Sequence, residues 1–394
     1  MFEYRPLSDA TEILEIASSA FAVRHPERRG LQEWLETSVA DGRELYGVYE
    51  ADRLQAGYML YDYDMRLRNS VVKMGGIGLL CSRLDGRGRG AVRAMLAGSL
   101  KTMRGKGQVV SVLDPFDEGF YRKYGWEKFS RLKVVEFSPG ALSVPEDDAS
   151  GLTATDLPFP DEAAQAFYNA YAARHHTLVQ RGVREWKRRT EILGWYPDAA
   201  VRGVVRFSRG EDVVGLLGYD IIRKASEEKS TFLVHLAITE REDVFREMLR
   251  YLRRLSHQVS TVRFDLPLDA DLWPYLSDRP TSCKIQDTFM IRIVSIEALD
   301  GLRIDAPDQS IRIAVEDPQA PWNQGTWELR IAAGVLHIAP AEAPDLRCDI
   351  GSLSTFVSGF STAQDLIAAG RMEALPGYAG QDLPATTPFL ADYF

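Results

Sequence analysis

The alternation of apolar and polar residues predicts an ordered series of strands and helices in the first third of the chain. Residues 43–61 contain two β-rich runs around a polar turn, and VVKMGGIGLLC (71–81) predicts a further strand. Apolar residues then recur at helical spacing over 91–104, and QVVSVL (108–113) has the pattern of a buried strand. The short helical segment that follows ends at Gly125, where we expect a left-handed stop. Together these elements predict a mixed α/β layer.

A linker rich in Pro, Ser and acidic residues is expected at 138–150, and beyond it the same order of elements recurs. The recurrence suggests a diverged internal duplication. Its predicted elements are strands at 201–207, 212–222 and 231–238, a helix at 239–255, and a strand at 261–266.

A third region starts near Met290, where short strands precede a serine-rich helical segment at 352–370. This pattern predicts a small α+β domain. The length of 394 residues exceeds the roughly 250–300 residues at which a single hydrophobic core stops growing. We therefore predict an α/β (α+β) chain of three domains, at 1–145, 146–288 and 289–394.

Composition excludes several classes of protein. Hydrophobic residues make up 45% and charged residues 26% of the chain, which is typical of a globular protein rather than a disordered or fibrous one. The chain contains no run of 18 apolar residues, so we expect no membrane span, and its start lacks the layout of a signal peptide. The net charge of −9 disfavours nucleic acid as a partner.

The three cysteines, Cys81, Cys283 and Cys348, are far apart and follow no metal-ligand spacing. We interpret them as buried small side chains of a protein in a reducing compartment, which predicts a cytoplasmic location. The adjacent His175 and His176 would point about 100° apart on a helix, so they do not share a metal. The sequence therefore predicts no metal site.

Basic residues concentrate in one window of this acidic chain. Residues 83–107 contain seven Lys and Arg residues against a single acid, Asp85. A basic island on an acidic protein suggests one anionic ligand rather than a polyanion surface. A solvated helix face is the alternative that charge alone leaves open.

The two halves differ at the start of their matched helices. In the second half, Thr239 and Glu242 have the T-x-x-E spacing of a capping box, which predicts that the helix satisfies its own first amides. In the first half, the run Arg87-Gly88-Arg89-Gly90 supplies only glycine and adds two positive charges. Open amides on glycine-permitted backbone beside guanidinium groups favour a phosphate site. A flexible basic turn is the alternative.

These residues resemble a known family. In the Gcn5-related N-acetyltransferases (GNAT), an R/Q-x-x-G-x-G/A turn between a strand and a helix holds the pyrophosphate of acetyl-CoA, and Arg87–Val92 is similar to it. The run RGRGAVRA followed by FYRKYG resembles one subgroup, the Eis-like (enhanced intracellular survival) acetyltransferases. The resemblance implies a catalytic GNAT domain, a degenerate second copy, a sterol-carrier-like C-terminal domain, acetyl-CoA as co-substrate, and a homohexamer.

The resemblance also implies roles for individual residues. It makes Tyr121 the acid that protonates the departing thiolate, and a phenol with a pKa of about 10 stays protonated at neutral pH. Without the resemblance, Tyr121 is an ordinary half-buried aromatic. The implied cofactor residues are Leu80, Cys81 and Ser82 for the pantetheine arm, Arg87, Gly88, Arg89, Gly90, Ala91, Val92 and Arg93 for the phosphates, and Phe116 and Asp117 where the pocket continues.

The base that the resemblance implies is the terminal carboxylate, which here belongs to Phe394. The apolar ending PFLADYF favours a docked segment, and a tail that only packs is the alternative. Phe21 and Trp34 match positions that line the acceptor pocket in the family, and both also fit a core role. The acceptor class stays open among aminoglycosides, polyamines and lysine-like amines.

We therefore expect an acetyl-CoA-dependent amine N-acetyltransferase that works through a direct ternary complex, without a covalent acetyl-enzyme. The expected partners are a small-molecule or peptide amine and further copies of the chain, with neither nucleic acid nor a membrane. The alternative is a non-catalytic CoA- or lipid-binding module that uses the C-terminal domain.

Overall fold

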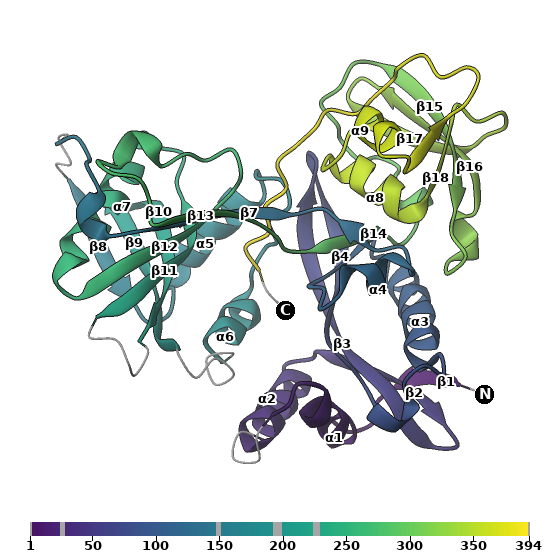
Figure 1. The fold of residues 1–394 in the computed structure, drawn as a ribbon, viewed down its shortest axis with the longest axis horizontal. Coiled ribbons are helices and arrows are strands. Elements are labelled where there is room, and N and C mark those ends of the chain that lie inside the picture. The colour runs from purple at the N-terminus through teal and green to yellow at the C-terminus, as the bar shows by residue number, and fades with distance from the viewer. Residues whose placement is uncertain (1, 24–27, 147–150, 192–198, 224–228, 393–394) are drawn as a thin grey trace. The chain divides into compact units, whose positions relative to one another are not determined.

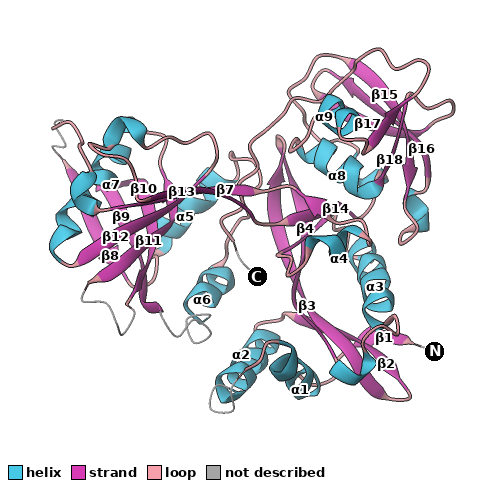
Figure 2. Ribbon diagram, in the orientation of Figure 1, coloured by secondary structure: helices cyan, strands magenta, loops and turns pink. Residues whose placement is uncertain are grey.

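The chain forms two compact units that each combine strands and helices (Figures 1 and 2). One unit comprises Met1–Ser130 and Thr288–Phe394, and the other comprises Arg131–Asp287. This architecture confirms the predicted mixed α/β fold class. The computed structural model describes residues 2–23, 28–146, 151–191, 199–223 and 229–392.

Seven strands form the first sheet, which belongs to the first unit. β4 and β5 are parallel neighbours, whereas β14 lies between β5 and β6 and runs antiparallel to both. In sheet order the strands are β1 (Glu3–Pro6), β2 (Glu44–Glu50), β3 (Arg53–Leu67), β4 (Ser70–Ser82), β5 (Val110–Leu113), β14 (Met290–Ile293) and β6 (Glu127–Lys128).

Helix α3 (Ala91–Gly105) makes the crossover that the parallel strands β4 and β5 require. Its apolar residues follow the predicted spacing, and Met95 and Leu100 are fully buried. Gly98 lets the helix approach β1 closely, because a Cβ at this position would lie 2.5 Å from ring atoms of Tyr4. The other helices of this region are α1 (Thr11–Ala20), α2 (Arg28–Ala40) and α4 (Glu118–Arg122).

The second unit contains a second seven-stranded sheet. Its strands, in sheet order, are β13 (Ser282–Asp287), β7 (Arg131–Phe137), β12 (Val259–Leu266), β11 (Ser230–Ile238), β10 (Asp212–Ile222), β9 (Ala199–Arg209) and β8 (Leu152–Leu157). Its helices are α5 (Glu162–Ala172), α6 (Val183–Glu191) and α7 (Glu242–Arg254).

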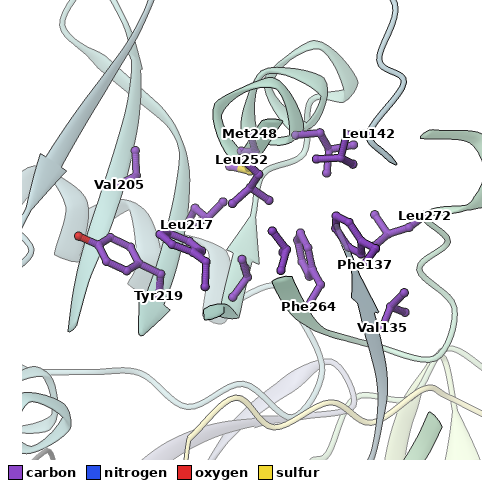
Figure 3. Packing of buried hydrophobic residues seen from close by; sticks show 14 of the residues in the cluster. Val135, Phe137, Leu142, Val205, Leu217, Tyr219, Met248, Leu252, Phe264 and Leu272 are labelled. Atoms are coloured by element: carbon purple, nitrogen blue, oxygen red, sulfur yellow. The ribbon is translucent and has the colours of Figure 1, made fainter. Parts of the chain in front are cut away.

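The core of the second unit lies between this sheet and α7 (Figure 3). Phe137, Leu217 and Phe264 project from β7, β10 and β12 and belong to the same buried cluster as Met248 and Leu252 of α7. The apolar positions that repeat along the strands therefore meet the apolar face of the helix, as the sequence pattern predicts.

The predicted capping box at the start of α7 is wrong. The helix begins after Arg241, and no side chain caps it. Thr239 lies two residues before the N-cap, Arg241. Its hydroxyl donates to the Val214 carbonyl at 2.9 Å and accepts from the Arg241 amide at 3.1 Å, so it does not reach the first amides inside the helix. Two acids in the first turn, Glu242 and Asp243, still complement the positive end of the helix.

A five-stranded third sheet completes the first unit. Two helices accompany it, α8 (Ile350–Ser358) and α9 (Ala363–Ala368). In sheet order its strands are β17 (Val335–Pro340), β16 (Gly325–Ala332), β15 (Gln309–Glu316), β18 (Leu346–Asp349) and β19 (Met372–Ala374).

Helix α8 is enclosed on all sides. Every residue of α8 is buried, because the helix packs against β14 and β6 of the first sheet and against β15 and β18 of the third. The hydroxyl of Ser354 donates to the Ile350 carbonyl at 2.6 Å and accepts from the Ile293 amide at 2.8 Å. The first and third sheets therefore share one continuous core.

Charged side chains join the same two sheets. Glu127 of β6 accepts hydrogen bonds from Arg122 at 2.7 Å and from Arg371 at 2.6 Å. Desolvation alone would raise the pKa of this carboxyl, but the two arginines hold it at about 2. Nearby, the fully buried Arg292 donates to the carboxylate of Asp317 at 2.6 Å.

Two strands lie across the predicted domain boundaries. β7 precedes residue 145 but pairs with β12 and β13 in the second sheet, and β14 follows residue 289 but belongs to the first sheet. The chain therefore passes from the first unit to the second after Ser130 and returns to the first after Asp287. A local pattern identifies a strand but not its distant partner, which is why the sequence placed these changes elsewhere.

The expectation that all three cysteines are buried is wrong for one of them. Cys81 and Cys348 are buried, whereas Cys283 is exposed on the edge strand β13. In the described part of the chain, no helix combines the length and the apolar character needed to cross a bilayer.

Candidate active site

β4 and β5 separate beyond a short parallel ladder. The ladder joins Met74–Ile77 to Val110–Leu113 and ends there. Leu79 adopts a left-handed φ of 53°, and one extra residue of β4 opposes β3 at this point, which makes a β-bulge. Bulges bend a strand, so β4 diverges from β5. Beyond the bulge, Cys81 and Ser82 pair with Gly57 and Ala56 of β3 on one edge, and the other edge of β4 no longer pairs with β5.

A short 3₁₀ helix, Leu84–Gly86, follows β4, and the glycine turn comes directly after it. Gly88 and Gly90 have φ values of 79° and 90°, a region that disfavours side chains. Gly90 is the N-cap of α3, and no side chain caps the helix. The first amides of α3, beginning with Ala91 and Val92, are therefore available to an anion at the positive end of the helix dipole.

Four of the seven basic residues of the island form ion pairs, namely Arg83, Arg89, Arg104 and Lys106. Arg89 pairs with Glu50 of β2 at 2.8 Å, so it is not the unneutralised charge that the sequence suggested. Arg87 and Arg93 are exposed and form no ion pair within the described residues. The positive charge free to meet an anion beside the helix start therefore comes from Arg87 and Arg93.

Tyr121 lies on α4, in the same buried cluster as Ile77 of β4 and Leu113 of β5. Its ring is 3% exposed, and Phe116 and Phe120 contact it edge-on with centroid distances of 5.4 and 5.2 Å. Burial raises the pKa of the phenol well above its usual value, and the charge of Asp114 raises it further. Tyr121 is therefore protonated at neutral pH and is able to donate a proton.

The two predicted residues before α4 have different surroundings. Asp117 caps the helix, since its carboxylate accepts from the Phe120 amide at 2.8 Å, and it thereby positions Tyr121. Phe116 is 72% exposed although its ring touches Tyr121. An aromatic side chain left uncovered beside the split is suited to contact a ligand there.

Three family models account for most of the chain. Residues 3–129 and 177–293 each match a model of an acetyltransferase (GNAT) domain, and residues 296–391 match a sterol carrier protein domain. The chain belongs to the GNAT acetyltransferases. It is an acyltransferase, and acetyl-CoA is the donor that this family uses.

Relatives and solved structures agree with this assignment. An uncharacterized N-acetyltransferase of Streptomyces coelicolor is 23% identical over 322 residues, 79% of this chain and 78% of that protein. The fold is shared with a GCN5-related N-acetyltransferase from Anabaena variabilis, with TM-score 0.84 and 18% identity. It is also shared with Eis1 from Mycobacterium abscessus, with TM-score 0.80 and 20% identity. Both comparisons cover 100% of both chains, which confirms the Eis-like layout.

Cys81 of this GNAT chain lies on β4, and its thiol is poorly suited to act as a nucleophile. Its thiol is 2% exposed and donates weakly to the Gly57 carbonyl at 3.7 Å. Burial raises the pKa of the Cys81 thiol to about 12. The thiolate needed for nucleophilic attack is therefore scarce at neutral pH.

The predicted acceptor residues lie at the first two helices. Phe21 ends α1 and is 46% exposed, and Trp34 is half-buried in α2. These helices pack against each other, and α1 also packs on β3 and β4. The exposure of Phe21 departs from a core role, whereas the environment of Trp34 is compatible with either role.

The predicted base, Phe394, lies outside the described residues. The segment that leads to it is held against the first unit, where Leu390 is 1% and Asp392 is 5% exposed. The Leu390 amide donates to the hydroxyl of Ser130 at 3.4 Å. The chain is therefore packed to within two residues of Phe394.

Sequence reasoning missed two features of this acetyltransferase site. The first is the bulge at Leu79, for which the glycine-rich run MGGIGLL was a signal. The second is Asp114, an acid that directly follows the buried strand β5. A polar residue at the end of a buried strand is a recognised signal for a functional side chain.

Proposed function

We propose that this protein transfers the acetyl group of acetyl-CoA to an amine of a small-molecule or peptide acceptor in a direct ternary complex. The observation that supports this most strongly is the layout of the split between β4 and β5. An uncapped helix start at Gly90, suited to the phosphates, lies at one side. The phenol of Tyr121, which is protonated at neutral pH, lies in the same buried cluster as Ile77 and Leu113, the last pair of the ladder between β4 and β5.

The proposed reaction moves protons in a defined order. A base takes one proton from the ammonium group of the acceptor, and the neutral nitrogen attacks the thioester carbonyl carbon. As the new C–N bond forms and the C–S bond breaks, the thiolate takes the proton of Tyr121. The phenolate then regains a proton from the nitrogen of the new amide. Amine and acetyl-CoA thus become amide and CoA thiol, with one proton left on the base.

No residue of the chain needs to carry the acetyl group. Cys81, the cysteine on the cofactor strand, is held protonated by burial, which favours direct transfer over a covalent acetyl-enzyme. We assign the base to the terminal carboxylate of Phe394, as the family resemblance implies. The burial of Leu390 and Asp392 supports this role, because the chain is packed up to two residues before Phe394.

Purified protein should consume acetyl-CoA in the presence of spermidine, lysine ethyl ester or kanamycin, measured as CoA thiol release. Tyr121→Phe should lower kcat at least 100-fold while CoA binding by calorimetry is unchanged, because only the transferred proton is lost. Adding one glycine after Phe394 should lower kcat sharply with an unchanged melting temperature. Full turnover in Tyr121→Phe would reject the acid role, and full turnover in the extended chain would reject the base role.

We also propose a cytoplasmic homohexamer, on the family resemblance alone. Light scattering at the concentration used for the kinetic assays tests the assembly. A monomer in that measurement would contradict it.

A further inference from the structure

A second carboxylate lies at the mouth of the split between β4 and β5. Asp114 is the first residue after the ladder, since Leu113 forms the last pair with Ile77. It is therefore located where the two strands begin to diverge. The glycine turn follows β4 after a short 3₁₀ helix, whereas Asp114 directly follows β5.

Asp114 is close to the proposed acid. The turn 114–117 is short, and the carboxylate of Asp117 fixes the start of α4 immediately after it. Leu113, the residue before Asp114, belongs to the same buried cluster as Tyr121, and the charge of Asp114 raises the pKa of the phenol. The carboxylate and the phenol therefore belong to the same local environment.

The fold does not use the charge of Asp114. Across the described residues, its carboxylate accepts no hydrogen bond and has no basic side chain within ion-pair distance, unlike its neighbour Glu118, which pairs with Lys128 at 2.8 Å. The side chain of Asp114 is exposed, so its unpaired carboxylate is open to a ligand at the point where β4 and β5 diverge. Partial desolvation raises the pKa of this carboxyl to about 6. An acid that the fold leaves unpaired at this position points to a function outside the folded chain itself.

Binding of a phosphate-bearing ligand does not explain an unpaired acid at this position. Two negative charges at this range repel each other, and the anion-binding features are the amides of α3 with Arg87 and Arg93. A cationic group does explain it, because an ammonium ion donates charge-assisted hydrogen bonds to the unpaired carboxylate. The position beside Tyr121 makes that group the amine of the acceptor.

We propose that Asp114 binds the ammonium group of the acceptor and holds it in front of the thioester. This inference rests on the proposed function and deepens it, since it restricts the acceptor to amines that are positively charged in solution. In this role Asp114 binds the acceptor and takes no part in forming or breaking a covalent bond. The proton still leaves to the separate base, and Tyr121 still protonates the thiolate.

The test compares Asp114→Asn with wild type and with Glu118→Gln, a matched control that removes a neighbouring but already neutralised acid. With spermidine as acceptor, Asp114→Asn should raise the KM for spermidine at least tenfold, change kcat less than threefold, and leave the KM for acetyl-CoA unchanged. Asp114→Glu should recover part of the loss. Glu118→Gln should have the same kcat and the same KM for spermidine as wild type.

Two results would overturn the inference. One is an unchanged KM for spermidine in Asp114→Asn, and the other is a fall in kcat with no change in KM, which would make Asp114 a base. Removing an unpaired charge should not lower the melting temperature, so misfolding is checked by a thermal melt.

A binding measurement keeps the inference separate from the proposed function. Spermidine is titrated calorimetrically into the protein saturated with CoA, and Asp114→Asn should weaken this binding at least tenfold. If wild type binds spermidine through Asp114 but acetylates no amine, the proposed function fails and the inference stands. If wild type acetylates spermidine but Asp114→Asn binds it equally well, only the inference fails.

Discussion

Replacing Arg68 with alanine should loosen the segment that follows α9 and destabilise the first unit. Arg68 lies in the turn between β3 and β4 and is 6% exposed. Its guanidinium donates to the carbonyls of Val357 at 2.7 Å, Pro384 at 2.6 Å and Phe356 at 3.2 Å. One side chain of the first sheet therefore holds both the end of α8 and the segment beyond it.

The size of the effect follows from the three acceptors. Val357 is buried, so its carbonyl loses a charged donor in a place that water does not readily reach. Such a loss costs about 1–3 kcal/mol, and the lost interaction with the negative end of α8 adds about 0.3–1 kcal/mol. Pro384 is exposed, and water replaces Arg68 there at little cost. We expect about 2–4 kcal/mol in total.

Calorimetric unfolding measures this loss. About 2–4 kcal/mol corresponds to a fall of roughly 4–16 °C in the transition of a unit of this size. The matched control is Arg330→Ala, which removes an exposed arginine of β16 and should shift the transition by less than about 2 °C. Proteolysis after α9 should also become faster in Arg68→Ala alone. Equal melting temperatures for the two variants would refute the anchoring role.

Three further predictions follow from charge and backbone geometry. The pKa of Glu127 is lowered to about 2 from an ordinary 4.5, so its ionised form contributes about 3 kcal/mol to the free energy of unfolding. This contribution is present above pH 4.5 and is lost as the pH falls towards 2. The melting temperatures of Glu127→Gln and wild type should therefore differ at pH 7 and converge near pH 2. Gly125→Ala places a Cβ against a guanidinium nitrogen of the buried Arg292 and should lower the free energy of unfolding in urea by more than about 3 kcal/mol. Its control, Gly301→Ala, has a similar φ but open space around the Cβ, and should lower that free energy by only about 1 kcal/mol. Gly90→Val should weaken CoA binding at least tenfold by calorimetry, whereas Gly107→Val, beyond the other end of α3, should not.

Local elements of the fold were predictable because their signals lie within a few residues. The helix over 91–104 is observed as α3 at Ala91–Gly105, and the predicted stop at Gly125 has a φ of 88°. The glycine turn was predictable for the same reason, since both its left-handed residues and its uncapped helix start are written in one short run.

Features that depend on distant residues were not predictable. β14 enters the first sheet between β5 and β6, and nothing in its own apolar run distinguishes this partner from the neighbouring third sheet. The predicted capping box is absent because the Thr239 hydroxyl donates to a carbonyl of β10, which lies far from it in the sequence. Arg89 is neutralised by Glu50, which lies about 40 residues earlier on another strand. A role for Asp114 could be inferred only once its effect on Tyr121, seven residues further on, was known from the structure.

The position of β14 also sets the order in which the protein is completed during synthesis. β5 and β6 are translated by residue 128, but the strand between them ends at Ile293. At the roughly 5–20 residues per second of a ribosome, the intervening chain takes about 10–30 s to make. All strands of the second unit, at 131–287, emerge within that interval. The first sheet, although it begins first in the sequence, is therefore the later of the two seven-stranded sheets to close.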